Sequence, residues 1–170
     1  MPPNNPNFIA PNVDLVSSYD TLDYFDLQSI SLPKNITALA AWDGVMSEPL
    51  PLLSTAFRVR DFISAKFGVK KIGGFSGARH ENLTAGDKID FFLIEKIDPN
   101  ILTLTARDKH LDVMTCVTTT KEKTGSVLEI TSSVVTHNLF GKIYMLPVGV
   151  FHRIIVKQML KRVRRKMQRA

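Results

Sequence analysis

Residues 88–137 read KIDFFLIEKIDPNILTLTARDKHLDVMTCVTTTKEKTGSVLEITSSVVTH, and this stretch decides the fold. Apolar and β-branched residues fill four runs of strand length in it: Ile89–Ile97, Ile101–Asp108, His110–Thr120 and Val127–His137. The first and last connections, at residues 98–100 and 121–126, contain proline, asparagine or glycine, which favour turns. Four strands joined by short turns predict an antiparallel meander.

A long helix is predicted directly after the meander. In residues 139–168, apolar side chains recur every three or four positions, which is the period of a helix with one buried face. Asn138 stands where an N-cap residue belongs. Pro147 must either start the main helix or kink a longer one, because proline has no backbone N–H to donate.

Three further elements are predicted before the meander. Residues 24–32 alternate imperfectly between apolar and polar side chains and indicate a strand. Residues 36–46 indicate a short helix, with Thr37 or Asn35 available as its cap. Apolar residues spaced as in a helix predict a second helix of about four turns over residues 53–67.

These elements predict an α+β fold with one domain, since 170 residues is an ordinary domain length. Prolines and asparagines crowd residues 1–18, which we expect to form a flexible arm, and residues 19–170 form the domain. A meander that curls around an amphipathic helix leaves space between sheet and helix. Side chains can fill that space or a ligand can occupy it.

The net charge of +6 is concentrated at one end of the chain. Residues 157–170 hold 7 of the 22 basic side chains and no acid, so the remaining 15 basic residues nearly balance the 16 acidic ones. This partition argues against a nucleic-acid-binding face, and we expect no nucleic-acid partner. A basic helix end is typical of a solvated terminus, and it can also make weak contact with an anionic membrane surface.

The single cysteine and the absence of a targeting or membrane pattern predict in which cellular compartment the protein is found. Cys116 is the single cysteine, so no intrachain disulfide forms. The opening residues lack the pattern of a secretory signal, and no uncharged apolar run reaches the length of a membrane span. We therefore expect a cytoplasmic location. Oligomeric state has no sequence signature here.

Three stretches are similar to the START-like (SRPBCC) superfamily, and within it to an uncharacterised bacterial domain-of-unknown-function family. They are Arg60-Asp61 with residues 67–70, residues 108–112 (Asp-Lys-His-Leu-Asp), and residues 136–144 continuing through Pro147 to 151–156. The resemblance covers about residues 20–163. It implies a helix-grip fold, in which a curved antiparallel sheet wraps around a long C-terminal helix. It implies no activity, because the superfamily includes carriers, receptors and cyclases.

The predicted strand 110–120 carries the main candidate site residues. A period of two places His110, Asp112, Met114 and Cys116 on one face. If that face lines the space under the helix, Asp112 could orient His110, which could act as a general base or a hydrogen-bond donor. The local alternative ties Asp112 to a turn or to Arg107 and leaves His110 at a hairpin tip. Cys116 we expect to be a small buried residue.

Further candidate ligand contacts come from elements that would border the same space. They are Arg60, His137, Tyr144, Phe151 and His152, in addition to His110, Asp112 and Met114. A solvated helix face or a satisfied border histidine is the alternative for the charged members. No spacing typical of a metal site, a nucleophile turn or a phosphate-binding loop occurs, so no cofactor is expected.

The sequence thus favours a protein that binds a hydrophobic or amphipathic small molecule between sheet and C-terminal helix. One alternative is an enzyme of cyclase or dehydratase type that uses His110 and Asp112 in that space. Another is a membrane-peripheral interaction module that uses the basic end of the helix.

Overall fold

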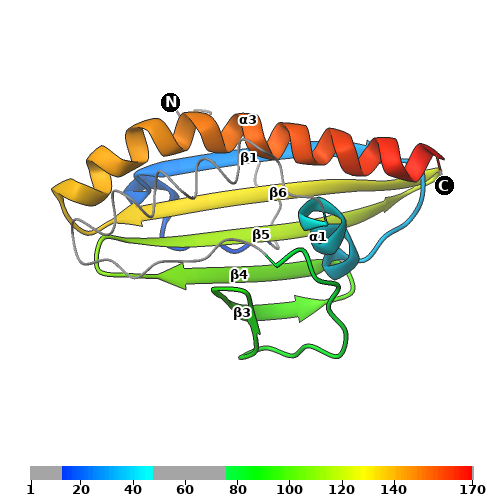
Figure 1. Cartoon of the computed structure of the whole chain (residues 1–170), viewed down its shortest axis with the longest axis horizontal. Helices are drawn as coiled ribbons and strands as arrows, with labels where there is room; N and C mark the ends of the chain where they lie inside the picture. Colours follow the sequence, from blue (N-terminus) through cyan, green and yellow to red (C-terminus); the bar gives the residue numbers. More distant parts are fainter. Residues whose placement is uncertain (1–12, 48–75, 170) are drawn as a thin grey trace.

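The structure, a computed structural model, describes residues 13–47 and 76–169. Its elements are η2 (Tyr19–Thr21), β1 (Tyr24–Leu32), α1 (Ala38–Met46), β2 (Lys88–Ile89), β3 (Phe92–Asp98), β4 (Ile101–Arg107), β5 (Leu111–Glu122), β6 (Gly125–Thr136) and α3 (Leu139–Arg169). The strands form one antiparallel sheet in the order β1-β6-β5-β4-β3-β2, with α3 lying along β1 and β6 (Figure 1). The predicted α+β fold is confirmed, as an open sheet with a long C-terminal helix.

The hairpin between β5 and β6 needs the glycine at its end. Gly125 has a φ of 102°, a backbone conformation that L side chains rarely adopt, and a Cβ there would collide with the carbonyl oxygen of Leu32. The chain therefore turns tightly enough for β6 to pair on its other side with β1, from Tyr24 opposite Val134 to Leu32 opposite Ser126.

The predicted strand Ile89–Ile97 is two strands in the structure. Asp90 adopts a φ of 54°, and its carboxylate accepts a hydrogen bond from the backbone N–H of Ser76 at 3.0 Å. This left-handed residue ends β2 after Ile89 and allows β3 to start at Phe92. The prediction of one continuous strand was wrong because a short polar residue interrupts an otherwise apolar run.

Both described helices have the caps that the sequence indicated. Thr37 Oγ1 accepts from the N–H of Ala40 at 3.2 Å, and Asn138 Oδ1 accepts from the N–H of Gly141 at 3.0 Å. Pro147 lies inside α3, which continues through it as one helix of 31 residues. The predicted second helix, residues 53–67, lies outside the described residues.

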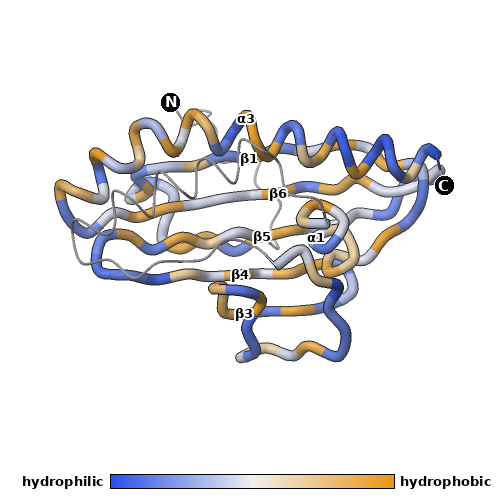
Figure 2. The backbone as a smooth tube through the Cα atoms, in the orientation of Figure 1, coloured by the Kyte–Doolittle hydropathy of each residue, from blue (hydrophilic) through white to orange (hydrophobic). Residues whose placement is uncertain are grey.

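The core occupies one end of the space between sheet and helix. There α1 and the C-terminal half of α3 pack on aliphatic side chains of the sheet, among them Leu102, Leu104, Val117, Leu128 and Ile130. Trp42 of α1 meets the ring of Phe92 edge-on, with 5.9 Å between centroids. Figure 2 shows apolar and polar residues alternating along this half of α3, as expected of a helix with one buried face.

The sheet has a helix face and an outer face. Asp26 contacts Arg153 of α3, so its side chain lies on the helix face. In register, Asp26 is opposite Ser132, and Ser132 is opposite Thr115. Directly opposed residues share a face, so Thr115 of β5 also lies on the helix face, and Asp112 comes three positions before it. Because side chains alternate along a strand, Asp112 lies on the outer face, away from α3.

Residues 13–18, part of the predicted arm, lie against the outer face. The N–H of Val16 donates to Ser133 Oγ at 3.0 Å, and Thr103 Oγ1 donates to Asp14 Oδ2 at 3.1 Å. These bonds attach this part of the chain to β4 and β6. Residues 1–12 of the predicted arm lie outside the described residues.

By length and composition alone, α3 could also cross a membrane. The sequence did not suggest this, because His152, Arg153 and Lys157 interrupt its most apolar stretch. Gly141 and Ile155 of this helix are buried. One face of the helix thus belongs to the fold, and the opposite face is open.

Candidate functional site

At the end of the sheet where α3 begins, the sheet face that α3 packs on is made of small side chains. On the helix face, neighbouring strands there present Ala106, Val113, Thr115, Ser132 and Val134, which we call the small-residue floor. The two central cross-strand pairs are Thr115 opposite Ser132 and Val113 opposite Val134. Toward the other end of the sheet, the same face carries leucine and isoleucine in the core. The floor therefore presents smaller side chains on this face than the core does.

Part of the floor is exposed to solvent, and one of its hydroxyl groups makes no hydrogen bond to the described residues. Ala106 and Val113 keep intermediate exposure, whereas Val134 and Ser132 are buried. The Ser132 hydroxyl is buried and has no hydrogen-bond partner among residues 13–47 and 76–169. A buried hydroxyl without a partner is uncommon in folded proteins, so Ser132 is the polar group of the floor whose hydrogen-bonding capacity is unused by the described residues.

Polar residues of β1 and α3 meet at the border of the floor. The border cluster consists of Tyr24, Asp26, Gln28, His152 and Arg153. The Tyr24 hydroxyl donates to the carbonyl oxygen of Gly149 at 3.1 Å and lies 3.3 Å from His152 Nδ1. Gln28 Nε2 donates both to Asp26 Oδ2 at 2.7 Å and to the carbonyl oxygen of Arg153 at 3.0 Å.

Asp26 is the acceptor at the centre of this cluster. Its Oδ1 lies 3.2 Å from Arg153 Nε, at ion-pair distance but without hydrogen-bond geometry, and its Oδ2 lies 3.7 Å from His152 Nδ1. Burial raises the pKa of Asp26, but the donors His152 and Gln28 and the charge of Arg153 outweigh it, so the pKa is lowered overall. Asp26 is therefore a carboxylate at neutral pH.

Tyr24, next to the Asp26 carboxylate, is the neutral polar group of the border cluster. Burial, reinforced by the charge of Asp26, raises the pKa of Tyr24 to about 12. The phenol therefore keeps its proton and acts as a hydrogen-bond donor at neutral pH. The cluster thus offers one anion, one cation and one neutral hydroxyl beside the apolar floor.

Close backbone contacts position this half of α3. A Cβ on Gly149 would lie 2.8 Å from a ring carbon of Tyr24, and one on Gly141 would collide with the carbonyl oxygen of His110. Glycine at both positions lets the helix approach β1 and the turn before β5. The two glycines thereby place His152 against Tyr24.

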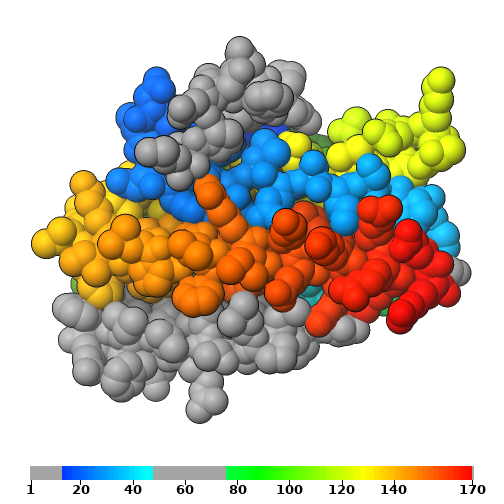
Figure 3. All heavy atoms as spheres, turned by 90° about the horizontal axis from the view of Figure 1, so that it is seen from above, coloured from blue at the N-terminus to red at the C-terminus, as the bar shows by residue number. Residues whose placement is uncertain are grey.

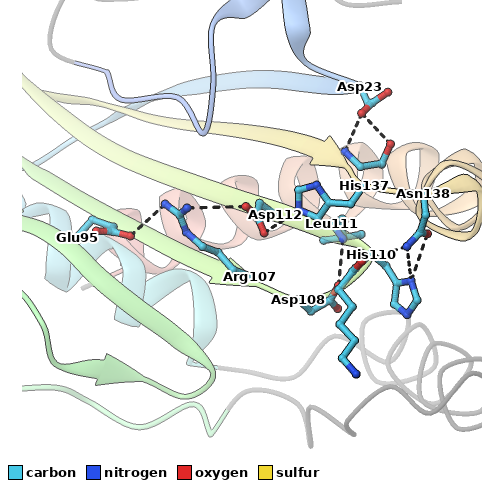
Figure 4. Close-up of polar contacts among 11 residues, drawn as sticks. Asp23, Glu95, Arg107, Asp108, His110, Leu111, Asp112, His137 and Asn138 are labelled. Carbon is cyan, nitrogen blue, oxygen red and sulfur yellow. Dashed lines mark hydrogen bonds and ion pairs between the residues drawn. The ribbon is translucent and has the colours of Figure 1, made fainter.

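The structure places Asp112 and His137 together on the outer face. His137 Nε2 lies 3.1 Å from Asp112 Oδ1, and Arg107 lies between Asp112 and Glu95, 3.8 Å from the first and 3.7 Å from the second (Figure 4). The local pairing of Asp112 with Arg107 that the sequence allowed is present. Met114 lies on the same outer face, two residues along β5. These three candidate residues therefore do not face α3.

His110 lies in the turn before β5 rather than in the strand. Its Nδ1 contacts the side-chain amide of Asn138, with its oxygen at 3.2 Å and its nitrogen at 2.9 Å, and its ring lies 4.6 Å from that of Phe140. Asp108, not Asp112, accepts from the backbone N–H of His110. His110 and Asp112 thus have different partners (Figure 4), and nothing in their placement supports a shared acid–base role under the helix.

Of the remaining predicted site residues, three lie on α3 and one lies outside the described residues. His152 belongs to the border cluster. Tyr144 stacks on Phe140 with 6.3 Å between ring centroids, and Phe151 is exposed on α3. Arg60 lies outside the described residues. Cys116 is buried, as expected, and burial raises the pKa of its thiol.

Sequence reasoning missed Tyr24, Asp26, Gln28, Arg153 and Ser132. The signal was the repeat of polar side chains at positions 24, 26 and 28 of one predicted strand, which normally indicates a solvent-facing side. Here that side faces the helix, because Arg153 and His152 of α3 supply partners for it.

Comparison with known proteins identifies a family. No curated protein matches this sequence. A solved structure of an uncharacterised protein from Rhizobium leguminosarum is similar, with a TM-score of 0.42 and 13% sequence identity over 82% of this chain and 95% of that one. The family model described as Protein of unknown function (DUF2867) matches residues 18–159. The chain therefore belongs to the DUF2867 family.

Proposed function

We propose that this protein binds a hydrophobic or amphipathic small molecule between the small-residue floor and the N-terminal half of α3. In this proposal the DUF2867 family falls within the START-like superfamily, and the sheet with its C-terminal helix is compatible with a helix-grip fold. The apolar body of the ligand lies on Val113, Val134 and Ala106. Its polar end lies toward Ser132 and the border cluster.

The observation that carries the proposal is the buried Ser132 hydroxyl, which lies between Asp26 and Thr115 in register and has no partner among the described residues. A hydroxyl in this position gains a hydrogen bond when a ligand group or an ordered water reaches it. The partial exposure of Ala106 and Val113 supports the same reading, because a core filled by side chains would cover them. A few polar groups beside an apolar surface are the usual composition of small-molecule sites.

The border cluster indicates what kind of polar group the ligand carries. Asp26 already has Arg153 and Gln28 as partners, so the ionic groups largely neutralise each other. The Ser132 hydroxyl, which can donate and accept, has no partner among the described residues. We therefore expect a neutral hydroxyl, carbonyl or amide on the ligand rather than a strongly charged head.

Titration with the neutral fluorescent probe 1-anilinonaphthalene, an apolar molecule with one N–H group, tests the proposal. Val113→Trp fills the floor and is expected to weaken probe binding by at least about 10-fold, because it occupies the space of the apolar body. Ser132→Ala removes the hydroxyl without adding volume and should weaken binding by about 5-fold. If Val113→Trp fails to fold, Ala106→Leu makes a smaller change at the neighbouring position.

The matched control is Leu146→Ser, on the side of α3 away from the floor, which should leave floor binding unchanged. A loss of probe binding in Leu146→Ser with none in Val113→Trp would place the probe on the helix surface and contradict the proposal. Absence of any saturable probe binding by the unaltered protein would contradict it as well.

A further inference from the structure

The face of α3 that points away from the sheet is apolar over its first four turns. Leu139, Ile143, Leu146, Val150 and Ile154 follow one another at spacings of four, three, four and four residues, which places them on one line along the helix. Their exposure ranges from 43% for Ile154 to 72% for Leu146. Figure 3, seen from above α3, shows the helix surface open along its length. We call these five residues the outer stripe.

The same line continues into basic residues. Lys157, Lys161 and Arg164 follow Ile154 at spacings of three, four and three, and all three are exposed. No Asp or Glu occurs anywhere in α3. The outward face of one helix is thus apolar in its first half and cationic in its second.

The fold does not account for this face. The core takes Ile155, Val156, Met159, Leu160 and Val163 from the opposite side of the helix. Exposed apolar side chains that occur singly need no explanation, but a contiguous line of five marks an interaction surface.

The charge and apolar pattern of this face indicates which kind of partner would bind it. A second copy of this chain would set basic residues against basic residues in a parallel pair, or bury them against the outer stripe in an antiparallel one. A nucleic acid could meet the cations but offers nothing to five aliphatic side chains. An anionic lipid surface offers both phosphates for the cations and an apolar layer for the outer stripe.

We propose that the outward face of α3 docks on an anionic lipid surface. Ile143, Leu146 and Val150 enter the headgroup boundary, and Lys157, Lys161 and Arg164 lie against lipid phosphates. The sheet and the small-residue floor remain on the protein side of the helix. This inference does not depend on the proposed ligand, because it uses residues on the other side of α3.

Cosedimentation of the full chain with phosphatidylcholine vesicles containing about one-third phosphatidylserine tests it. We expect saturable binding that weakens as salt rises from about 0.05 to about 0.5 M, and little binding to phosphatidylcholine alone. The set Lys157→Gln, Lys161→Gln and Arg164→Gln should weaken binding by about 100-fold. The set Ile143→Ser, Leu146→Ser and Val150→Ser should weaken it by at least about 10-fold.

A variant with the same loss of charge elsewhere is the control. Lys88, Lys96 and Lys109 are exposed, and none of them lies on α3 or on β1, which α3 covers. Their replacement by glutamine should leave vesicle binding within about 3-fold of the unaltered protein, since salt screens charges distant from the surface. Equal loss in this control would show attraction by net charge alone and overturn the docking face.

Three other results would overturn the proposal. The first is no binding to the anionic vesicles at low salt. The second is a dimer that the serine set converts to a monomer, which would assign the face to a second copy. The third is binding to duplex DNA, but not to vesicles, that only the glutamine set removes. Val113→Trp, which tests the ligand site, should keep full vesicle binding, so the two proposals can fail separately.

Discussion

The two halves of α3 pack on the same face of the same sheet but do so with different chemistry. The C-terminal half places Met159, Leu160 and Val163 against leucine and isoleucine, and all of these are buried. The N-terminal half places Gly149 and His152 against Tyr24 of β1, and Gly141 against the backbone of His110. Stability thus resides mainly at one end of the interface, and the other end keeps the polar groups and small side chains to which we assign the proposed ligand.

Truncation of one large apolar residue in each half gives the largest expected contrast. Leu160→Ala should lower the free energy of unfolding by about 2–5 kcal/mol, because Leu160 is 2% exposed in the close-packed core. Met145→Ala, in the half over the floor, should cost about 1 kcal/mol or less, since Met145 is only partly buried. Urea unfolding of both variants measures this. Equal losses would contradict the contrast between the two halves.

Glycine substitutions test how closely the N-terminal half approaches the sheet. Gly141→Ala should destabilise by about 1–3 kcal/mol, because the added methyl meets the backbone oxygen of His110, which cannot move away cheaply. Gly44→Ala in α1 is the matched control, since its methyl would lie at an ordinary 3.7 Å from Val163. That change should stabilise by about 0.5–1 kcal/mol through helix propensity. Thermal unfolding should therefore show shifts of opposite sign.

The border cluster predicts a pH dependence for the same half. The pKa of Asp26 is lowered in the folded protein, so its carboxylate stabilises the fold above the ordinary aspartate pKa of about 4, and this contribution is lost as pH falls through the folded value. Asp26→Asn should cost about 1–2 kcal/mol at pH 7, less than a fully buried ion pair because Arg153 is partly exposed.

Urea unfolding from pH 7 to pH 2 measures the difference between Asp26→Asn and the unaltered protein, which should shrink below pH 4 or so. Glu122→Gln, at an exposed hairpin position, serves as the control and should show a smaller difference at every pH. A difference for Asp26→Asn that stays constant down to pH 2 would show that the carboxylate charge is not what stabilises this half.

The sequence predicted the order of elements well because the signals for it are local. Alternation, turn residues and the cap at Asn138 depend on neighbours within a few positions, and they marked β4, β5, β6 and α3 closely. The split between β2 and β3 was missed, because nothing in the local pattern marks Asp90 as left-handed, and its hydrogen-bond partner Ser76 lies 14 residues away.

The site was harder to predict because it depends on which face of the sheet meets α3. The alternation of side chains along β5 correctly places Asp112 and Met114 on one face and Val113 and Val117 on the other. It does not tell which face meets α3, because both faces carry apolar residues. The register with β6 and β1 fixes the choice, and Asp26 lies 127 residues from its partner Arg153. No local pattern carries that information.

Asp112→Asn should have the smallest effect and gives the sharpest test of which sheet face holds the site. Its ion pairs with His137 and Arg107 are partly exposed, so the change should alter the free energy of unfolding by about 1 kcal/mol or less. Binding of the anilinonaphthalene probe should be unchanged, because Asp112 points away from the small-residue floor. His137→Gln should behave in the same way. If either variant lost the probe while keeping its stability, the ligand would have to lie on the outer face, and the division of function between the two halves of α3 would be wrong.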